Sequence, residues 1–296
     1  MEFSHLTKKA VDKLSLSNND RIYYIKKPRW IGYSKAQDIL NKLEDLYHYP
    51  QQSRMPNMLI IGETNNGKTV LVNKFREKHP PDKNLEGENI ILPILYVQAP
   101  PSPDERGLYN SILNKLFEPY GRSESTDTKR ERVISILSRI DLRMIMIDEF
   151  QHLLAGSYTK QRNYLNALKY LGNELGVPLV GVGTAEALRA VQTDPQLANR
   201  FTPEILPKWQ LDEEFLRLLA TFESLIPLKY ASNLTSAELA THIHMKSCGV
   251  IGEISTLLIK ASEFAIKNKI EKINIDVLNN CGFISPDQRK KVANLL

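Results

Sequence analysis

The chain has 296 residues, of which 42% are hydrophobic and 25% are charged, a balance that is typical of a folded globular protein and excludes wholesale disorder. This length allows one large or two modest domains, with a core that needs no disulfide or metal to stabilise it. Lysine and arginine number 39 against 34 acidic residues, and the formal net charge of +5 permits a polyanionic partner without requiring one.

Membrane insertion and disulfide stabilisation are not expected. No apolar run approaches the roughly 20 residues that span a bilayer, and the N-terminal stretch lacks the apolar segment of a signal peptide. Cys248 and Cys281 match neither a CxxC redox pair nor a zinc arrangement, so we expect both to be packing residues. The sequence therefore predicts a cytoplasmic protein with no membrane partner.

In chain order, residues 1–28 are polar and are expected to form an N-terminal arm or linker. Apolar residues with helical spacing then predict a helix that begins at Ser34 and ends near Tyr49. Strand-like apolar runs alternate with helical stretches after that. The predicted strands are Met58–Ile61, Ile91–Val97, Met144–Ile147, Leu179–Val182 and a short one around Glu204–Leu206, and the helices between them include Tyr109–Phe117, Lys129–Ile140 and Asn163–Glu174. This alternation predicts a doubly wound α/β domain with a parallel sheet.

After Trp209 the chain offers only helical patterns. The predicted helices are Glu213–Leu225, Ser236–Lys246, Glu253–Lys267 and Asp276–Asn280. We therefore expect an α/β domain over residues 29–209, a small helical domain over residues 210–282 and a C-terminal tail over residues 283–296.

The strongest motif is GETNNGKT at residues 62–69, which fits GxxxxGK[ST] without a mismatch. It follows a predicted strand and opens a predicted helix, so backbone amides and the helix N-terminus can surround a phosphate. Lys68 is placed to reach the outer phosphates of a nucleotide, and Thr69 to offer its hydroxyl to Mg²⁺. The residues expected to bind nucleotide are Gly62, Glu63, Thr64, Asn65, Asn66, Gly67, Lys68, Thr69 and Val70.

A second motif is the apolar strand that ends in Asp148 and Glu149. Taken alone, an acidic pair at this position is equally typical of a strand whose end is exposed to solvent. Beside a P-loop it is the expected second half of a nucleoside triphosphatase site, in which Asp148 supports the Mg²⁺ shell and Glu149 polarises the attacking water.

Two further residues are candidates for the same site. Thr184 follows an apolar strand, and the carboxyl ends of parallel strands meet at the ligand crevice. It is placed to orient the water or to read the γ-phosphate, to cap the helix Ala185–Val191, or to do both. Arg200 is either an arginine finger that reaches the nucleotide of a neighbouring subunit or a solvated surface arginine.

The order of these parts resembles that of the AAA+ ATPases, and within them the TniB/TnsC family of transposition regulators. The resemblance covers about residues 29–280 and rests on WIGY at 30–33, GETNNGKT at 62–69, MIMIDEF at 144–150, LVGVGT at 179–184, ANRF at 198–201 and GVIGEISTLLIKASEFAI at 249–266. It implies an AAA+ P-loop domain with a C-terminal helical lid, and ATP and Mg²⁺ as cofactors. The catalytic residues that it implies are Lys68, Asp148, Glu149, Thr184 and Arg200, with Thr69 and Asp148 at the metal. Ile31 and Tyr33 would lie near adenine, with core packing as the alternative.

The same resemblance implies an ATP-dependent homo-oligomer, a ring or a helical filament, that assembles on double-stranded target DNA and recruits a transposase. A target-selection protein, TniQ-like or an RNA-guided complex, would be a further partner, and ATP hydrolysis would reset the assembly. Cationic and hydroxyl side chains after the second strand suit backbone phosphates. These are Arg106, Arg122, Thr128, Lys129 and Arg132. Acidic residues are interleaved with them, so a solvated charged helix face is the alternative for each one.

One departure concerns the lid. Many AAA+ proteins carry an arginine there that contacts the γ-phosphate, whereas the matching turn here is Gly252-Glu253-Ile254. We therefore expect hydrolysis to be slow or to depend on a partner, and Gln98, at the end of the second strand, is a candidate to hold Glu149 inactive. The alternatives are a helicase loader or initiator of the AAA+ type, a nucleotide-gated scaffold with little hydrolysis, and a signalling ATPase unrelated to DNA.

Overall fold

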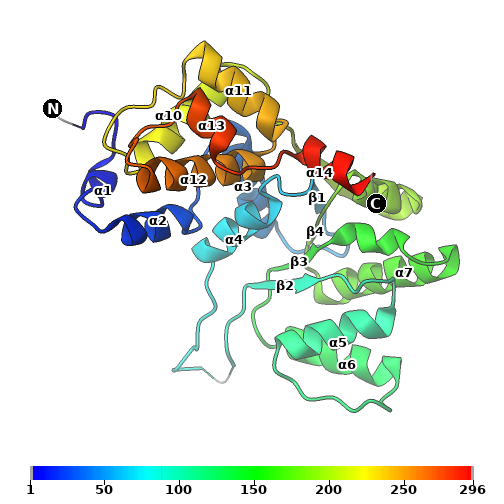
Figure 1. Cartoon of the computed structure of the whole chain (residues 1–296). Coiled ribbons are helices and arrows are strands. Elements are labelled where there is room, and N and C mark those ends of the chain that lie inside the picture. The colour runs from blue at the N-terminus through cyan, green and yellow to red at the C-terminus, as the bar shows by residue number, and fades with distance from the viewer. Residues whose placement is uncertain (1–2, 88, 295–296) are drawn as a thin grey trace. The chain divides into compact units, whose positions relative to one another are not determined.

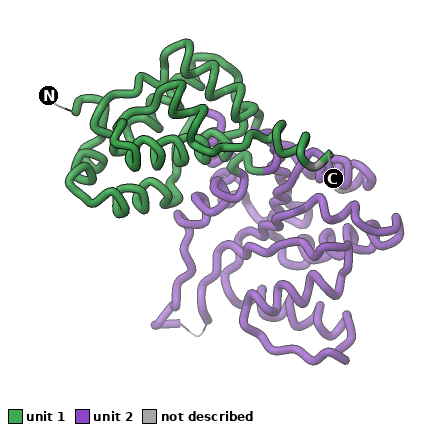
Figure 2. Tube along the Cα trace, viewed as in Figure 1, with its two compact units in different colours: residues 1–33, 65–67, 207–296 green, residues 34–64, 68–206 purple. Residues whose placement is uncertain are grey.

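The computed structural model describes residues 3–87 and 89–294, which divide into two compact units (Figure 2). Unit 1 consists of the chain up to Tyr33, the short segment Asn65–Gly67 and the chain from Pro207 onward. Unit 2 consists of Ser34–Thr64 and Lys68–Leu206. The residues of the glycine-rich loop are thus divided between the two units: its middle belongs to unit 1, and its two ends belong to unit 2.

Unit 2 is built on a five-stranded parallel sheet (Figure 1). Its strands are β1 (Asn57–Gly62), β2 (Ile94–Gln98), β3 (Met144–Asp148), β4 (Leu179–Gly183) and β5 (Phe201–Leu206). They lie in the order β2-β3-β4-β1-β5, and every neighbouring pair is parallel. Each residue of β1, β3 and β4 is buried, which is why these strands are unbroken apolar runs in the sequence. The predicted α/β class with a parallel sheet is confirmed.

Helices cover this sheet and close its core. The helices of unit 2 are α3 (Ser34–Tyr47), α4 (Lys68–Lys78), α5 (Glu105–Lys115), α6 (Thr126–Leu137), the short 3-10 helix η1 (Phe150–Leu154), α7 (Tyr158–Leu175), α8 (Ala185–Gln192) and α9 (Pro195–Ala198). One apolar cluster joins α5, α6, α7 and α8 to side chains of β1, β2, β3 and β4, with Leu59, Leu95 and Ile147 among its members. Helices α3 and α4 contact each other and β5, β1 and β4. The fold therefore fixes the strand ends from which the candidate site is built.

Several predicted boundaries move for local reasons. Helix α5 begins earlier than the apolar pattern indicated because the Asp104 carboxylate caps it, accepting from the backbone N–H groups of Arg106 and Gly107. The second strand begins three residues later than predicted, at Ile94. Ile91 instead forms an isolated antiparallel bridge with Asp82, ahead of a proline that has no N–H to give to a ladder.

Unit 1 is helical. Its helices are α1 (Lys8–Val11), α2 (Asn18–Lys26), α10 (Glu213–Leu225), α11 (Ala237–Ser247), α12 (Ile251–Lys267), α13 (Ile275–Asn280) and α14 (Pro286–Ala293). One apolar cluster connects α2 with α10, α11, α12 and α13, and Phe215, Ile243 and Leu257 are fully buried in it. Cys281 packs against the same cluster, and both cysteines are free thiols. The predicted helical region after the sheet domain is therefore present.

The N-terminal segment corrects a prediction. Residues 1–28 were expected to be an arm or linker, yet α2 buries Ile22 and Ile25 in the core of unit 1. Arg21 is buried as well, and its guanidinium pairs with Glu271 at 2.6 Å. The helical pattern is weak in the sequence because the buried face of α2 includes this arginine, which a hydrophobicity pattern assigns to the surface.

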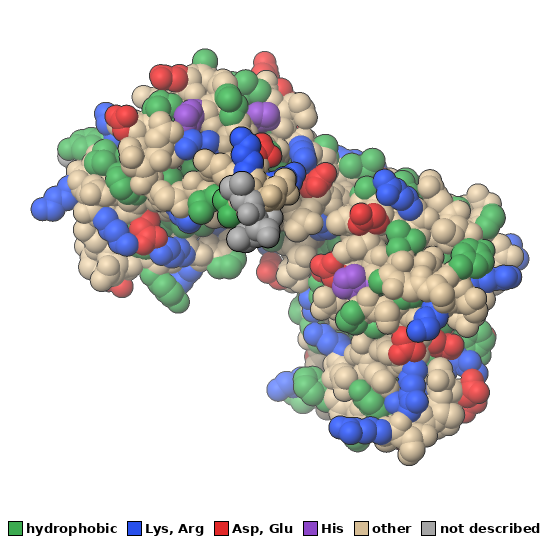
Figure 3. Space-filling model, turned by 45° about the vertical axis from the view of Figure 1, so that its right-hand side comes forward, with side chains coloured by type: hydrophobic (Ala, Val, Ile, Leu, Met, Phe, Trp, Pro, Cys, Tyr) green, Lys and Arg blue, Asp and Glu red, His purple; other side chains and the backbone are tan. Residues whose placement is uncertain are grey.

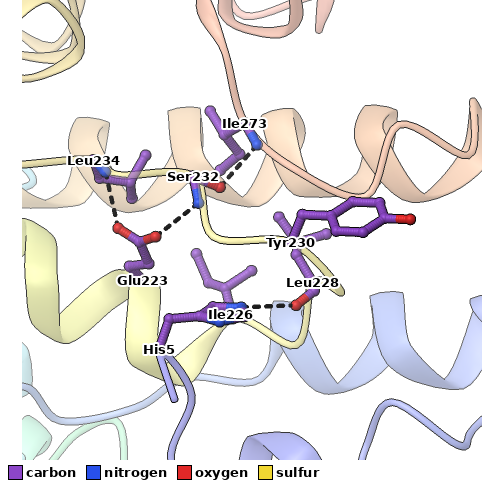
Figure 4. Close-up of a pocket in the computed structure, with 8 residues that line it drawn as sticks. All are labelled: His5, Glu223, Ile226, Leu228, Tyr230, Ser232, Leu234 and Ile273. Carbon is purple, nitrogen blue, oxygen red and sulfur yellow. Dashed lines mark hydrogen bonds between the residues drawn. The ribbon is translucent and has the colours of Figure 1, made fainter. Parts of the chain in front are cut away.

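Both ends of the chain contribute to unit 1. The imidazole Nε2 of His5 donates to the Leu228 carbonyl at 3.1 Å, beside a small pocket in which the Glu223 carboxylate accepts from the backbone N–H groups of Ser232 and Leu234 (Figure 4). The polar groups of this pocket bond to one another, so it is a structural feature. The expected C-terminal tail forms α14, which opens with a capping box between the side chains and backbones of Ser285 and Gln288. Within the described residues, no helix combines the length and apolar character that crossing a bilayer requires.

Candidate nucleotide-binding site

The candidate residues of unit 2 meet at one edge of its sheet. Strands β3, β4 and β1 are neighbours, and their carboxyl ends are Asp148, Gly183 and Gly62. The register pairs Ile61 with Gly183, so the ends of β1 and β4 lie level. Because parallel strands end on the same side, the glycine-rich loop, the acidic pair and Thr184 converge there, as the sequence predicts.

Lys68 opens α4, and its ammonium folds back over the start of the glycine-rich loop. Its Nζ donates to the carbonyl oxygens of Gly62 and Glu63, at 2.8 Å each. Burial lowers the pKa of Lys68, and the nearby carboxylates of Asp148 and Glu149 oppose that shift. Gly62 favours this close packing, because a Cβ at this position would meet Leu206 at 3.2 Å, which is tighter than usual. The lysine thus carries its charge at the place where the loop can receive an anion.

Asp148 is 7% exposed, and its carboxylate has three donors. The Thr69 hydroxyl donates to Oδ2 at 3.2 Å, the Tyr96 hydroxyl donates to the same oxygen, and the backbone N–H of Glu149 donates to Oδ1 at 2.8 Å. Burial and the bond to Asp148 raise the pKa of Tyr96, so its phenol stays a donor. Tyr96 is a site residue that the sequence analysis missed, and its place two residues before the end of β2 is the only signal of it.

Glu149 has a left-handed backbone, with φ 55°, which is uncommon for a residue other than glycine and recurs at functional sites. Its carboxylate is 43% exposed and accepts from the Gln151 amide, with the His152 Nε2 at 4.0 Å. The same Gln151 side chain accepts from the backbone N–H of Thr184 at 3.2 Å. Gln98 was the predicted partner of Glu149. That assignment is corrected, since Gln151 provides the amide and Gln98 is exposed at the end of β2.

Thr184 precedes α8 in the N-cap position, yet its hydroxyl donates to the Glu186 carboxylate at 2.9 Å and caps no backbone N–H of the helix. The preceding Gly183 lets Gln151 approach closely, because a Cβ there would lie 2.6 Å from the Gln151 Oε1. Glu149, Gln151 and Thr184 therefore form one connected group of polar side chains and backbone.

The middle of the glycine-rich loop belongs to unit 1, where it contacts the start of α12. Asn65 and Gly67 both have left-handed backbones, with φ 63° and 82°, which favours the curled conformation of a phosphate loop. The Asn65 side-chain amide donates to the Glu253 Oε1 at 3.0 Å, and the Asn65 carbonyl accepts from the backbone N–H of Gly252 at 3.0 Å. Glu253 thus contacts the loop from the position where the sequence lacks the expected arginine.

Other predicted residues lie in ordinary structural settings. Arg200 donates from Nη1 to the Asn173 Oδ1 at 3.0 Å within unit 2. Ile31 is buried in the core of unit 1, and the Tyr33 ring packs edge-on against Trp209, with 4.8 Å between centroids. Burial raises the pKa of Tyr33 to about 12. Val70, in the first turn of α4, is half exposed.

The predicted DNA-binding side chains differ in their exposure. Arg122 and Thr128 are exposed, and Arg106 and Arg132 are partly exposed. Lys129 does not fit the prediction, because it is 1% exposed and its ammonium is bonded to Asn110 at 2.6 Å. On the face shown in Figure 3, basic and acidic side chains are interspersed instead of forming a field of one sign. This face therefore carries no field of a single charge sign that would attract DNA phosphates at long range.

The oxygen donors of Thr69 and Asp148 fit Mg²⁺, which binds through one or two protein oxygens together with substrate phosphates. Among the residues that the structure describes, no group of three or more His, Cys, Asp or Glu side chains is placed to hold a metal ion.

The fold and the site together define a P-loop protein with the AAA+ fold. Solved structures with this fold include the Aeropyrum pernix ORC2 protein in ADPNP-ADP complexes, with a TM-score of 0.60 and 15% identity over 87% of this chain and 70% of that one. Drosophila ORC bound to DNA gives a TM-score of 0.60 and 13% identity over 95% of this chain and 69% of that one. Cdc6p from Pyrobaculum aerophilum gives a TM-score of 0.58 and 16% identity over 84% of this chain and 67% of that one.

The family model described as bacterial TniB protein matches residues 21–211, which is more than half of the chain. The chain therefore belongs to the TniB family, as its motifs indicated. No curated protein matches it.

Proposed function

We propose that this TniB protein is an ATP-dependent DNA-binding regulator of transposition that oligomerises on target DNA and recruits a transposase. The observation that carries the proposal is the convergence of Lys68, Thr69, Asp148 and Glu149 at one sheet edge, in a chain of the TniB family. ATP hydrolysis would reset the assembly, and the family assignment supports the link to transposition.

In this proposal each residue has a defined role. Lys68 binds the outer phosphates of ATP, and Asp148 and Thr69 hold Mg²⁺, which when bound neutralises phosphate charge. Glu149 orients and polarises the attacking water, and Gln151 holds its carboxylate near Thr184. Arg200 would act on the nucleotide of a neighbouring subunit, for which it must exchange its bond to Asn173.

The support for DNA binding comes from similar solved structures and not from a sequence motif. One similar structure is of Drosophila ORC bound to DNA, and Arg106, Arg122, Thr128 and Arg132 remain candidates for contacts with backbone phosphates. Because the net charge of one chain is only +5, affinity would come from many subunits aligned by ATP as a ring or filament. A TniQ-like or RNA-guided target selector would be a further partner in the cytoplasm.

A helicase loader or initiator is the second candidate, favoured by the likeness to ORC and Cdc6 structures. That likeness reports the fold alone, whereas the family match favours transposition. A transposase gene next to the gene for this protein would favour the first candidate, and ATP-dependent binding of a ring helicase would favour the second.

The test of the proposed function compares two variants in DNA binding and phosphate release. Lys68→Ala should abolish ATP-dependent assembly on duplex DNA, because the phosphates lose their ammonium partner. Glu149→Gln should bind ATP and DNA but release phosphate at least about a hundredfold more slowly, since removal of a general base costs about that much or more. Normal phosphate release by Glu149→Gln would show that another group activates the water.

A further inference from the structure

Glu253 connects the phosphate loop to the C-terminal helix of the chain. Its carboxylate is 10% exposed, and Oε1 accepts from the Asn65 side chain at 3.0 Å. The other oxygen, Oε2, forms an ion pair with the Arg289 Nη2 at 2.6 Å. All three residues belong to unit 1, so a chain of two polar contacts runs from α14 through α12 to the loop.

The start of α12 lies very close to the backbone of the loop. The backbone N–H of Gly252 donates to the Asn65 carbonyl at 3.0 Å, and a Cβ on Gly252 would lie 2.5 Å from that same oxygen. Only glycine permits this approach. The Glu253 carboxylate is therefore held next to Asn65 by the backbone as well as by its own hydrogen bond.

A carboxylate in this place opposes the binding of a polyanion. A nucleoside triphosphate brings several negative charges to the loop, and a charge that is mostly removed from solvent is poorly screened. The Arg289 guanidinium lies close enough to the Glu253 carboxylate to offset its charge. The positive charge that the lid sequence lacks at residue 253 is thus supplied by another helix.

The contacts that hold helix α14 in unit 1 are weak enough for a binding partner to displace it. None of its side chains that the structure describes is buried, and Val292 is 57% exposed. Besides the ion pair of Arg289, a polar contact joins Asp287 to the Cys248 thiol at 3.6 Å. Polar contacts of exposed side chains are individually weak, so a competing partner could displace this helix.

We propose that Arg289 is a positioning residue for nucleotide binding, which neutralises Glu253 beside the phosphate loop and thereby couples the C-terminal helix to nucleotide affinity. The proposal rests on the proposed function, since it takes the loop as an ATP site. A partner that binds α14 and removes Arg289 would leave the Glu253 charge unpaired and promote release of the nucleotide.

The test is an equilibrium titration of the full-length protein with a fluorescent, non-hydrolysable ATP analogue. Arg289→Ala should weaken binding by about tenfold, since one unpaired charge then faces the phosphates. Arg289→Lys should bind like the wild type, because it keeps the charge. The double variant Arg289→Ala with Glu253→Gln should recover most of the affinity, since glutamine removes the charge and keeps an acceptor for Asn65.

Lys290→Ala is the matched control, because it removes one positive charge from the same helix without touching Glu253, and it should leave affinity unchanged. Recovery in the double variant separates the charge effect from a loosening of α14, which glutamine at residue 253 would not repair. Unchanged affinity in Arg289→Ala, or a double variant as weak as the single one, would overturn the inference. Wild-type binding no tighter than that of Lys68→Ala would instead overturn the proposed function on which it rests.

Discussion

Tyr96 is the least expected member of the site, and its hydroxyl offers a direct test of how Asp148 is held. Tyr96→Phe removes one of the three donors to the Asp148 carboxylate and keeps the aromatic ring. The Arg76 guanidinium, 4.6 Å from the ring centroid, can still pack on phenylalanine. The change is therefore limited to one hydrogen bond on a buried carboxylate.

The magnitude follows from that bond. A hydrogen bond to a charged group contributes about 1.5–3 kcal/mol, and at 7% exposure water can replace little of it at Asp148. Loss of an outer-shell partner of a metal ligand costs about 10–100-fold in metal affinity. We expect the Mg²⁺ concentration for half-maximal ATP binding to rise by at least about tenfold.

The assay is a titration of Mg²⁺ at fixed fluorescent ATP analogue, with a parallel titration of the analogue in EDTA. Tyr96→Phe should shift the first titration and leave the second nearly unchanged, because the metal ligand is affected and the phosphate loop is not. Tyr109→Phe is the matched control, since it removes a phenol that donates to the Glu105 carboxylate at 3.1 Å elsewhere in unit 2. An unchanged Mg²⁺ dependence in Tyr96→Phe would refute the assignment of Asp148 as a metal ligand oriented by Tyr96.

Three further predictions concern stability, DNA binding and pH. Arg21→Met should destabilise unit 1 by about 3–5 kcal/mol, because it leaves a buried carboxylate unpaired, and denaturation followed by tryptophan fluorescence reports this since both tryptophans lie in unit 1. Burial raises the pKa of Glu271, but the hydrogen bond and charge of Arg21 outweigh burial and hold that pKa below 4.5. The stability lost in Arg21→Met should therefore be largest above pH 4.5, where the carboxyl is ionised, and should shrink as the pH falls through the lowered pKa. Lys129→Ala should reduce stability, because this lysine is buried. Arg122→Ala should reduce DNA affinity and its salt dependence and leave stability unchanged, because Arg122 is exposed. The reverse result would show that Lys129, and not Arg122, contacts DNA. Because burial lowers the pKa of Lys68, ATP affinity should fall at alkaline pH below the 10.5 of an ordinary lysine, and binding that persists to higher pH would contradict this.

The parts that the sequence predicts well are those in which residue type and local position carry the chemistry. The glycine-rich loop and the Asp148–Glu149 pair each lie at the carboxyl end of a buried apolar strand, so the strand fixes their position in the fold. Parallel pairing then brings them together without any further information. The fold class and the family follow from the same segments.

The parts that it misses depend on partners far along the chain. Arg21 is buried because Glu271 pairs with it. Lys129 is buried because its ammonium donates a hydrogen bond to the Asn110 side-chain oxygen and lies 4.2 Å from the centroid of the Tyr120 ring. In the sequence each of these cations has the pattern of a surface residue. The contact of Arg289 with Glu253 is of the same kind, since only the folded unit brings a residue of the expected tail to the start of α12.

The central claim is that ATP assembles this protein on DNA, and electron microscopy of the protein with duplex DNA and a non-hydrolysable ATP analogue tests it most directly. The account predicts a ring or helical filament around the duplex, present with the analogue and absent with ADP or with Lys68→Ala. A monomer under all of these conditions would contradict it.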